Sequence, residues 1–362
     1  MQKEYISQKR LAVVSFTPGG KEQAERVQKQ LAAPLEDTLW EVMHVHKPKP
    51  LKEWCRRQFE GAEGILFIGA MGIAVRTIAP FLESKTKDPA VLVMDEKGGF
   101  VISVLSGHIG GGNELARLLA RRLGAVPVIT TASDVNKKIA LDVFAQKNGL
   151  HICDMQRIKE AEAAILEGKR LHFYCEGQVN GYLPRELSAS YEEADFSIRV
   201  SPYLSGDDTV EATDGRPREV WLIPKAFVLG IGCRKGKTAK EISAAVKEEL
   251  FRRRISLESL YAAATIDLKQ EEEGLLEFLG GLRLPLTCYT AEELRQAPGV
   301  YAASSFVASV TGVDNVCERA AVCKVREEDP QKQKEECLAV PKIKKDGITI
   351  ALAQREWSVE FE

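Results

Sequence analysis

The stretch that decides the fold class is an apolar run leading into a glycine-rich loop: Phe100-Val101-Ile102-Ser103-Val104-Leu105-Ser106-Gly107-His108-Ile109-Gly110-Gly111-Gly112-Asn113. The run at 100–104 is rich in β-branched and aromatic residues, which is typical of a strand. Beyond the loop, residues 114–123 carry leucines at helical spacing, and residues 126–129 form another apolar run. A strand, a helix and a strand in this order predict an α/β protein.

The residues on either side of this stretch repeat the alternation. Toward the amino terminus we expect a polar helix at 21–31 and strands at 11–16, 40–45, 64–68 and 91–94. Toward the carboxyl terminus a further helix is predicted at 135–148. Together these elements predict an N-terminal domain of residues 1–135 with a doubly wound, mainly parallel sheet.

The chain has 362 residues, which is long enough for further domains. Periodicity weakens between Gly177 and Arg218, which predicts a small middle α/β domain with a linker over residues 136–224. A strand at 225–229 then opens a C-terminal α/β domain over residues 225–355. Because Asp346-Gly347 lies between two apolar runs, the signal of a hairpin, this domain should contain a mixed sheet.

Composition excludes several classes of protein. The 50 basic and 52 acidic residues nearly balance, so no overall field attracts nucleic acid or an anionic membrane. No run reaches the ~18 apolar residues of a membrane span, and the amino terminus carries no export signal. The eight cysteines show no Cys-x-x-Cys pair. We therefore expect a cytoplasmic protein with no metal site of its own.

The loop at 106–113 is the first candidate site. Its glycines, Gly110 and Gly111 among them, allow a ligand to approach the backbone, and Asn113 is a good N-cap for the following helix. His108 could exchange a proton at neutral pH, although a surface histidine is the alternative. Ser106 is either a ligand contact or a turn residue, and it lies in no Gly-x-Ser-x-Gly elbow.

A second candidate loop is Gly69-Ala70-Met71-Gly72-Ile73-Ala74-Val75-Arg76, where a strand again ends and a helix begins. Gly69 and Gly72 would let a ligand approach, and Arg76 could clamp a carboxylate, although a solvated helix arginine is the alternative. We expect this loop to lie at the same carboxyl edge of the sheet as the histidine loop, because ligands bind at that edge.

A third candidate loop is Gly230-Ile231-Gly232-Cys233-Arg234-Lys235-Gly236-Lys237. Its spacing is one residue away from both the dinucleotide fingerprint and the P-loop, which argues against a nucleotide-dependent enzyme. An anion site at a helix start remains, with Gly230, Gly232, Arg234 and Lys237 as candidate contacts and solvated surface charges as the alternative. Cys233 is either a reactive thiol or a packing residue.

Together, these three motifs resemble the cobalt-precorrin-5A hydrolase (CbiG) family of anaerobic cobalamin biosynthesis. The resemblance covers nearly the whole chain, and the C-terminal domain is similar to the stand-alone CobE proteins. It implies a hydrolase that opens the δ-lactone of cobalt-precorrin-5A and releases acetaldehyde, giving cobalt-precorrin-5B. The substrate would be a cobalt-bound tetrapyrrole with many carboxylates, so no cofactor is expected because cobalt is carried by the substrate.

Residue roles follow from the chemistry of this substrate. We expect His108, with Ser106, to act on the lactone and helix starts near 72, 113 and 238 to bind carboxylates. As a pathway enzyme the protein would make transient contacts with its neighbours in the pathway, and the sequence does not give its oligomeric state. The alternative function is a non-catalytic tetrapyrrole-binding or carrier protein of the same pathway.

Overall fold

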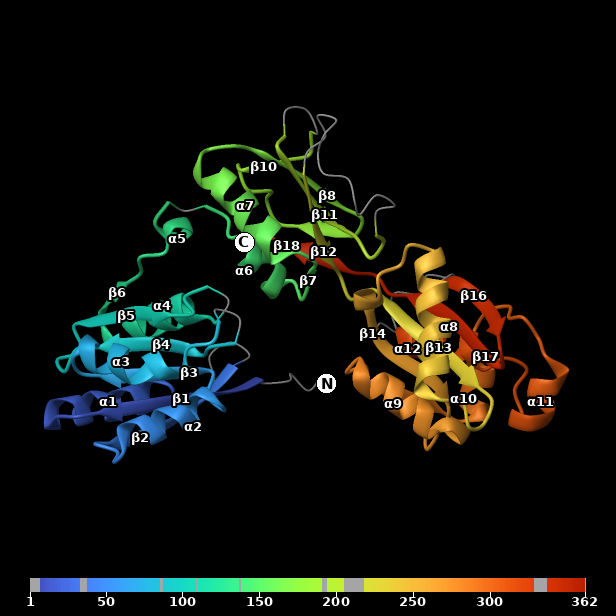
Figure 1. The fold of residues 1–362 in the computed structure, drawn as a ribbon, viewed down its shortest axis with the longest axis horizontal. Coiled ribbons are helices and arrows are strands. Elements are labelled where there is room, and N and C mark those ends of the chain that lie inside the picture. The colour runs from blue at the N-terminus through green and yellow to red at the C-terminus, as the bar shows by residue number, and fades with distance from the viewer. Residues whose placement is uncertain are drawn as a thin grey trace. The chain divides into compact units, whose positions relative to one another are not determined.

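The computed structural model describes residues 7–32, 38–84, 87–108, 110–136, 138–190, 194–204, 218–328 and 337–361. Three larger sheets occupy residues 7–128, 151–223 and 227–354 (Figure 1). The chain divides into two units, Met1–Val143 and Phe144–Glu362, and each is described by itself. Within the described ranges, no helix is long and apolar enough to span a membrane.

The first unit contains a six-stranded sheet in the order β2-β1-β3-β4-β5-β6. Its strands are β1 (Ser7–Ser15), β2 (Thr38–His46), β3 (Gly64–Ile68), β4 (Ala90–Met94), β5 (Phe100–Leu105) and β6 (Val126–Val128). Every neighbouring pair is parallel except β4 and β5, which are antiparallel. The predicted mainly parallel sheet is therefore confirmed, with one reversal.

Helices cover both faces of this sheet, because alternate strand residues are apolar on both sides. On one face α1 (Pro18–Gln30) and α4 (Gly112–Leu123) pack over residues such as Leu66 and Leu92. On the other face α2 (Leu51–Phe59) and α3 (Met71–Ile78) pack over residues such as Phe67 and Val93. The sheet is therefore doubly wound, as predicted.

The single helix predicted at 135–148 is wrong. Two short helices take its place, α5 (Ala132–Asn136) and α6 (Leu141–Lys147). Asn136 donates from its side-chain amide to the carbonyl of Ala132 at 2.8 Å, a local bond that competes with helix continuation. This break is important for the site described below, because it places Asp134 in α5 and Asp142 in α6.

The middle region of the second unit has a five-stranded sheet in the order β10-β8-β11-β12-β7. Its strands are β7 (His151–Ile152), β8 (Leu171–Cys175), β10 (Leu187–Ser188), β11 (Phe196–Val200) and β12 (Arg218–Ile223), with α7 at Met155–Leu166. The sequence between 177 and 218 is thus no simple linker, since it contributes the central strand β11. Part of that segment lies outside the described residues.

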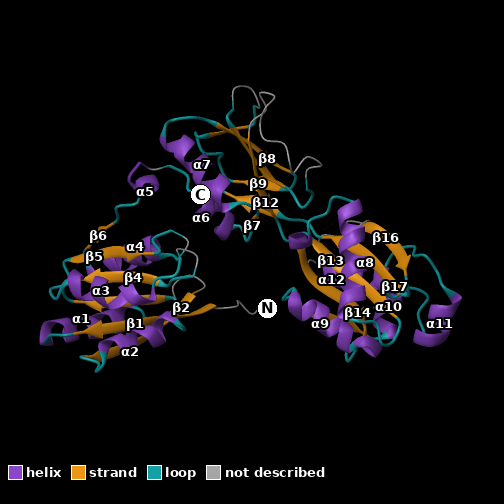
Figure 2. Cartoon of the chain, viewed as in Figure 1, coloured by secondary structure: helices purple, strands orange, loops and turns teal. Residues whose placement is uncertain are grey.

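The C-terminal region has a mixed sheet in the order β15-β14-β13-β17-β16 (Figure 2). Its strands are β13 (Phe227–Cys233), β14 (Leu260–Ile266), β15 (Leu286–Tyr289), β16 (Leu338–Lys345) and β17 (Ile348–Gln354). Its helices are α8 (Ala239–Arg252), α9 (Glu273–Gly281), α10 (Ala291–Gln296), α11 (Ser305–Thr311) and α12 (Cys317–Glu328). The hairpin predicted at Asp346-Gly347 is confirmed, with both residues at positive φ. The last strand, β18 (Ser358–Glu360), pairs with β9 (Gln178–Asn180) of the middle region.

One boundary in this domain differs from the prediction. Strand β13 continues to Cys233, so Gly230 lies inside the strand and not in an open loop. A Cβ on Gly230 would lie 1.9 Å from the carbonyl oxygen of Cys317, at the start of α12. The glycine therefore serves the close packing of α12 on the sheet, and its expected role as a ligand contact stays a prediction.

We predict that Gly230→Ala lowers the free energy of unfolding by at least ~2 kcal/mol, because α12 must move away from β13. The matched control is Gly280→Ala, since a Cβ at this exposed position in α9 meets no atom within 4 Å. Alanine should stabilise that helix by roughly 0.5–1 kcal/mol. Urea unfolding of both variants tests this, and equal stabilities would contradict the packing role.

Candidate functional site

The histidine loop and the Arg76 loop lie at opposite edges of the first sheet. Leu105 at the end of β5 pairs with Val91 at the beginning of β4. By contrast, the N–H of Gly69 donates to the carbonyl of Met94 at the end of β4, at 2.8 Å. The expectation that both loops share one edge is therefore wrong, because β5 runs antiparallel to β4.

The histidine loop closes on itself before α4 begins. The N–H of Gly112 donates to Ser106 at 3.0 Å, and the N–H of Asn113 donates to Gly107 at 2.8 Å. The helix starts at Gly112 with Gly111 as its N-cap, at φ 75°, so Asn113 is not the cap. These two N–H groups are therefore occupied by the loop's own carbonyls, and the expected anion cradle is not open here.

His108 is held between two carboxylates. Its Nε2 lies 2.7 Å from Oδ2 of Asp134 in α5, and its Nδ1 lies 3.8 Å from Oδ1 of Asp142 in α6. Ser133 Oγ lies 3.1 Å from the same Nε2. The side chain of Asp142 is only 3% exposed, whereas those of His108 and Asp134 are 18% and 17% exposed. A buried and a partly exposed carboxylate thus flank one imidazole.

Two residues of α4 complete the cluster around Asp134. The side-chain amide of Asn113, which is 3% exposed, donates to Asp134 Oδ2 at 2.8 Å and to Thr131 Oγ1 at 2.9 Å. Arg117 forms an ion pair with the other oxygen of Asp134, Oδ1, and a second pair with Glu114 at 2.9 Å. Asn113 and Arg117 are four residues apart, so they share one face of the helix.

These contacts shift the pKa values of His108, Asp134 and Arg117, each in the direction that favours the charged form of the group. Asp142, and more weakly Asp134, raise the pKa of His108 against the opposing effect of burial. Burial would raise the pKa of Asp134, but Arg117 and His108 outweigh it and lower that pKa. The pKa of Arg117 is raised, first of all by Asp134. Both flanking carboxylates therefore favour the protonated form of the His108 imidazole.

Among the described residues, the hydroxyl of Ser106 forms no hydrogen bond with His108. Ser106 is a non-glycine residue at φ 53°, and its Oγ is buried without a hydrogen-bond partner among the described residues. A Cβ on Gly110 would lie 2.4 Å from the Cβ of Ser106, so only glycine fits there. The hydroxyl beside the histidine is that of Ser133, and a role for Ser106 stays a prediction.

At the opposite edge, the Arg76 loop is open. A Cβ on Gly72 would lie 3.3 Å from Nη2 of Arg76, so this side chain folds back over the start of α3. Among the described residues, none forms a hydrogen bond or ion pair with Arg76. Gly69, at φ 151°, packs against Phe16. Carboxylate binding by this loop stays a prediction, but not as part of the His108 cluster.

The third loop, in the second unit, already holds carboxylates of the protein. Lys237 pairs with Glu241 of its own helix at 2.7 Å. The N–H of Gly236 donates to Glu272 at 2.6 Å, and Lys269 pairs with the other oxygen of Glu272 at 2.7 Å. Arg234 and Gly232 lie at the exposed end of β13, and their role in substrate binding stays a prediction.

Burial raises the pKa of the Cys233 thiol, which favours the packing residue over the reactive thiol.

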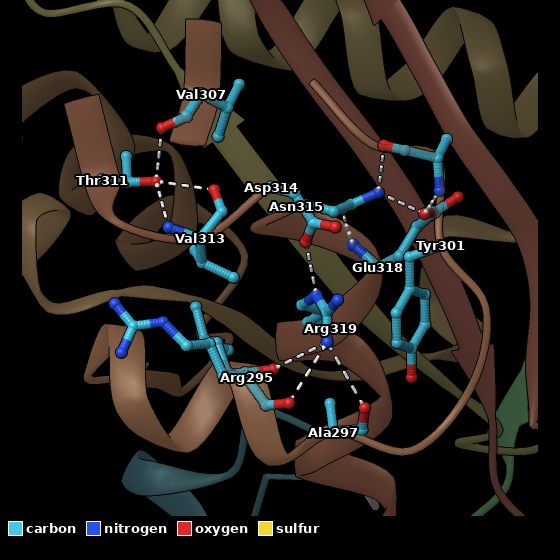
Figure 3. Close-up of polar contacts among 12 residues, drawn as sticks. Arg295, Ala297, Tyr301, Val307, Thr311, Val313, Asp314, Asn315, Glu318 and Arg319 are labelled. Atoms are coloured by element: carbon cyan, nitrogen blue, oxygen red, sulfur yellow. Dashed lines mark hydrogen bonds and ion pairs between the residues drawn. The ribbon is translucent and has the colours of Figure 1, made fainter. Parts of the chain in front are cut away.

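The sequence analysis also missed a buried polar cluster in the C-terminal domain (Figure 3). Glu318, 2% exposed, accepts from the backbone N–H of Ala302 at 3.0 Å and contacts Asn315, which is fully buried. Arg319 pairs with Asp314 at 2.9 Å and lies over the ring of Tyr301. These contacts anchor the loop before α11 on α12, which is a structural role.

Three residues of the His108 cluster also escaped the sequence analysis: Arg117, Asp134 and Asp142. Arg117 is one of several charged residues on α4, and nothing in its spacing separates it from Arg121 or Arg122. Asp142 was assigned to the predicted helix at 135–148, and Asp134 directly precedes that helix; neither belonged to a motif. The one available signal was a polar Asn113 at a position that points inward from an apolar helix.

Three family models match this chain in sequence order. The model described as "Cobalamin synthesis G N-terminal" matches residues 53–134, which include the histidine loop and Asp134. The model "Cobalamin biosynthesis central region" matches residues 139–224. The model "Cobalamin synthesis G C-terminus" matches residues 227–353. The first range covers β3–β6 of the first sheet, and the other two ranges cover the five-stranded sheets of the middle and C-terminal regions.

Curated relatives agree with these models. A cobalt-precorrin-5A hydrolase of Salmonella typhimurium is 33% identical over 324 residues, which cover 86% of this chain and 90% of the relative. Another, of Priestia megaterium, is 34% identical over 277 residues, or 73% of each chain. A solved cobalamin biosynthesis protein G homolog of Sulfolobus solfataricus is 23% identical, with 98% of this chain and 99% of that chain covered at a TM-score of 0.38. The chain belongs to the cobalt-precorrin-5A hydrolase (CbiG) family of cobalamin biosynthesis and is a hydrolase.

Proposed function

We propose that the protein opens the δ-lactone of cobalt-precorrin-5A at the His108 cluster and releases acetaldehyde, giving cobalt-precorrin-5B. One observation supports this placement most strongly. The buried carboxylate of Asp142 lies 3.8 Å from Nδ1 of His108, and the more exposed carboxylate of Asp134 lies 2.7 Å from Nε2. A carboxylate on one ring nitrogen orients an imidazole so that its other nitrogen can exchange a proton with substrate.

The first step of this proposal is the hydrolysis of the lactone. Water adds to the acyl carbon and releases its two protons to solvent, the bond between that carbon and the ring oxygen breaks, and Nε2 of His108 gives its proton to the departing oxygen. The raised pKa of His108 suits this role, because it extends the acid form of the imidazole to higher pH. The products of the step are a carboxylate and a free hydroxyl on the carbon that carries the methyl group.

The second step releases that carbon. The neutral imidazole takes the hydroxyl proton back, the oxygen forms a carbonyl, and the carbon–carbon bond to the macrocycle breaks. The electron pair of this bond goes to the macrocycle, which takes up a proton from solvent. In sum, the lactone and one water give a carboxylate, acetaldehyde and one proton, and His108 returns to its starting form.

The peripheral carboxylates of the substrate need cationic partners. Among the described residues, the guanidinium groups of Arg76 and Arg234 form no hydrogen bond or ion pair. Arg76, however, lies at the other edge of the first sheet from His108. Lys237 is paired with Glu241, so binding there requires an exchange of partners. That the protein itself holds no metal or cofactor, with cobalt brought by the substrate, stays part of this proposal.

We predict that the wild-type protein releases one acetaldehyde per cobalt-precorrin-5A under anaerobic conditions, measured with an aldehyde trap. His108→Ala should lower this turnover at least ~10²-fold, because the proton donor is lost. His151→Ala is the matched control, since His151 lies on β7 of the middle region and should leave turnover unchanged. Tight binding of the substrate with no aldehyde from the wild type would sink the proposal in favour of a carrier.

We also predict a pH effect for Asp142→Asn. The carboxylate of Asp142 is the largest cause of the raised pKa of His108, so its loss should lower that pKa. The acid form of His108 is present below its pKa and is lost as the pH rises through it. The alkaline limb of kcat/KM should therefore move to lower pH in the variant, and an unmoved limb would exclude His108 as the acid.

A further inference from the structure

The carboxylate of Asp134 sits in a set of donors that are positioned independently of it. Arg117 pairs with Oδ1, whereas Oδ2 accepts from Asn113 at 2.8 Å and from His108 at 2.7 Å. Arg117 and Asn113 project from the same helix, α4, and His108 projects from the loop that precedes this helix. Two cations and an amide thus converge on one O–C–O group of the protein.

The ester of a lactone has the same planar O–C–O arrangement as a carboxylate. An ester in the position of the Asp134 carboxylate would place its carbonyl oxygen at Arg117. Its ring oxygen would then lie at Nε2 of His108, the atom that the proposed mechanism uses as the proton donor. The two oxygens of Asp134 therefore occupy the two positions that lactone opening requires.

The two carboxylates around His108 also differ in how firmly they are held. Asp142 lies in α6 beside the fully buried Leu141, and its own side chain is 3% exposed. Asp134 lies in α5, which has no buried residue, and its neighbour Val135 is 65% exposed. A short helix with no buried side chain has little packing energy to lose when it moves. Asp134 can therefore leave at a lower cost than Asp142.

We infer that Asp134 is an internal stand-in for the ester group of the substrate. Once the substrate displaces it, Arg117 binds the acyl oxygen, and Asn113 and His108 contact the ring oxygen. This inference rests on the proposed function. As water adds, the electron pair of the carbonyl moves to that oxygen, and Arg117 neutralises the charge. The pair returns as the ring bond breaks and His108 protonates the ring oxygen. The new carboxylate remains in the same place until Asp134 displaces it.

The binding arm of the test uses propionate as a probe in Asp134→Ala. The five histidines of the chain make the imidazole NMR spectrum simple, and His108→Ala assigns the signal of His108. We expect propionate to shift this signal saturably at millimolar concentrations in Asp134→Ala, and at least ~10-fold more weakly in the wild type. The reason is that the internal carboxylate competes for the same donors.

Two controls make the binding arm specific. Asp134→Ala combined with Arg117→Ala should lose the propionate effect. Asp195→Ala removes a different carboxylate, one that pairs with Lys169 at 2.6 Å, and should not create the effect. Thermal unfolding confirms that each variant is folded. A folded Asp134→Ala protein whose His108 signal ignores propionate would overturn the inference.

The kinetic arm separates displacement from a catalytic role of Asp134. If Asp134 only competes, Asp134→Ala keeps kcat within ~3-fold and lowers KM, whereas Arg117→Ala lowers kcat by ~10²-fold or more. Arg121→Ala, on the same helix, is the control. A large loss of kcat in Asp134→Ala would overturn the inference while leaving the proposed function standing. Absence of acetaldehyde from the wild type would instead remove the proposed function, and the propionate arm could still show the subsite.

Discussion

The antiparallel pairing of β5 with β4 is the constraint on which the His108 cluster depends. It turns the loop after β5 to the edge where β1–β4 begin. Because β6 is parallel to β5, the chain leaves β6 at that same edge and continues into α5 and α6. Asp134 and Asp142 therefore return to the loop that carries His108. If the sheet were parallel throughout, these residues would end at the opposite edge.

Opposite charges lie close together in the cluster, which explains how partly buried ionised groups are retained. Arg117 pairs with Asp134 and Glu114, and the carboxylates of Asp134 and Asp142 flank the imidazole of His108. Removing one member leaves an uncompensated charge, which is costly in a partly desolvated site. A substrate ester in place of the Asp134 carboxylate removes a negative charge beside His108. The pKa of His108 therefore depends on which group occupies the position of Asp134.

Much of the fold was predictable from the sequence, because strands such as Gly64–Ile68 are continuous apolar runs and the Asp346-Gly347 turn has a specific geometry. The direction of β5 was not predictable, since a turn between two apolar strands does not identify their partners. His108 was found through its glycine loop. Asp142 was missed because it lay within one predicted helix at 135–148, where the structure has two shorter helices. Asp134 was missed because it preceded that helix and belonged to no motif. Gly230 was read as a loop residue, although a neighbouring helix is the reason for that glycine.

The most direct test of this account compares two titrations of the wild-type protein. One is the pH titration of the His108 imidazole in the free protein, and the other is the alkaline limb of kcat/KM for acetaldehyde release. The limb in kcat/KM reports the ionisation of the free enzyme. The account predicts that both occur at the same pH, above the ordinary range of histidine, because Asp142 and Asp134 flank the ring. A limb that titrates at a pH away from that of His108 would contradict it.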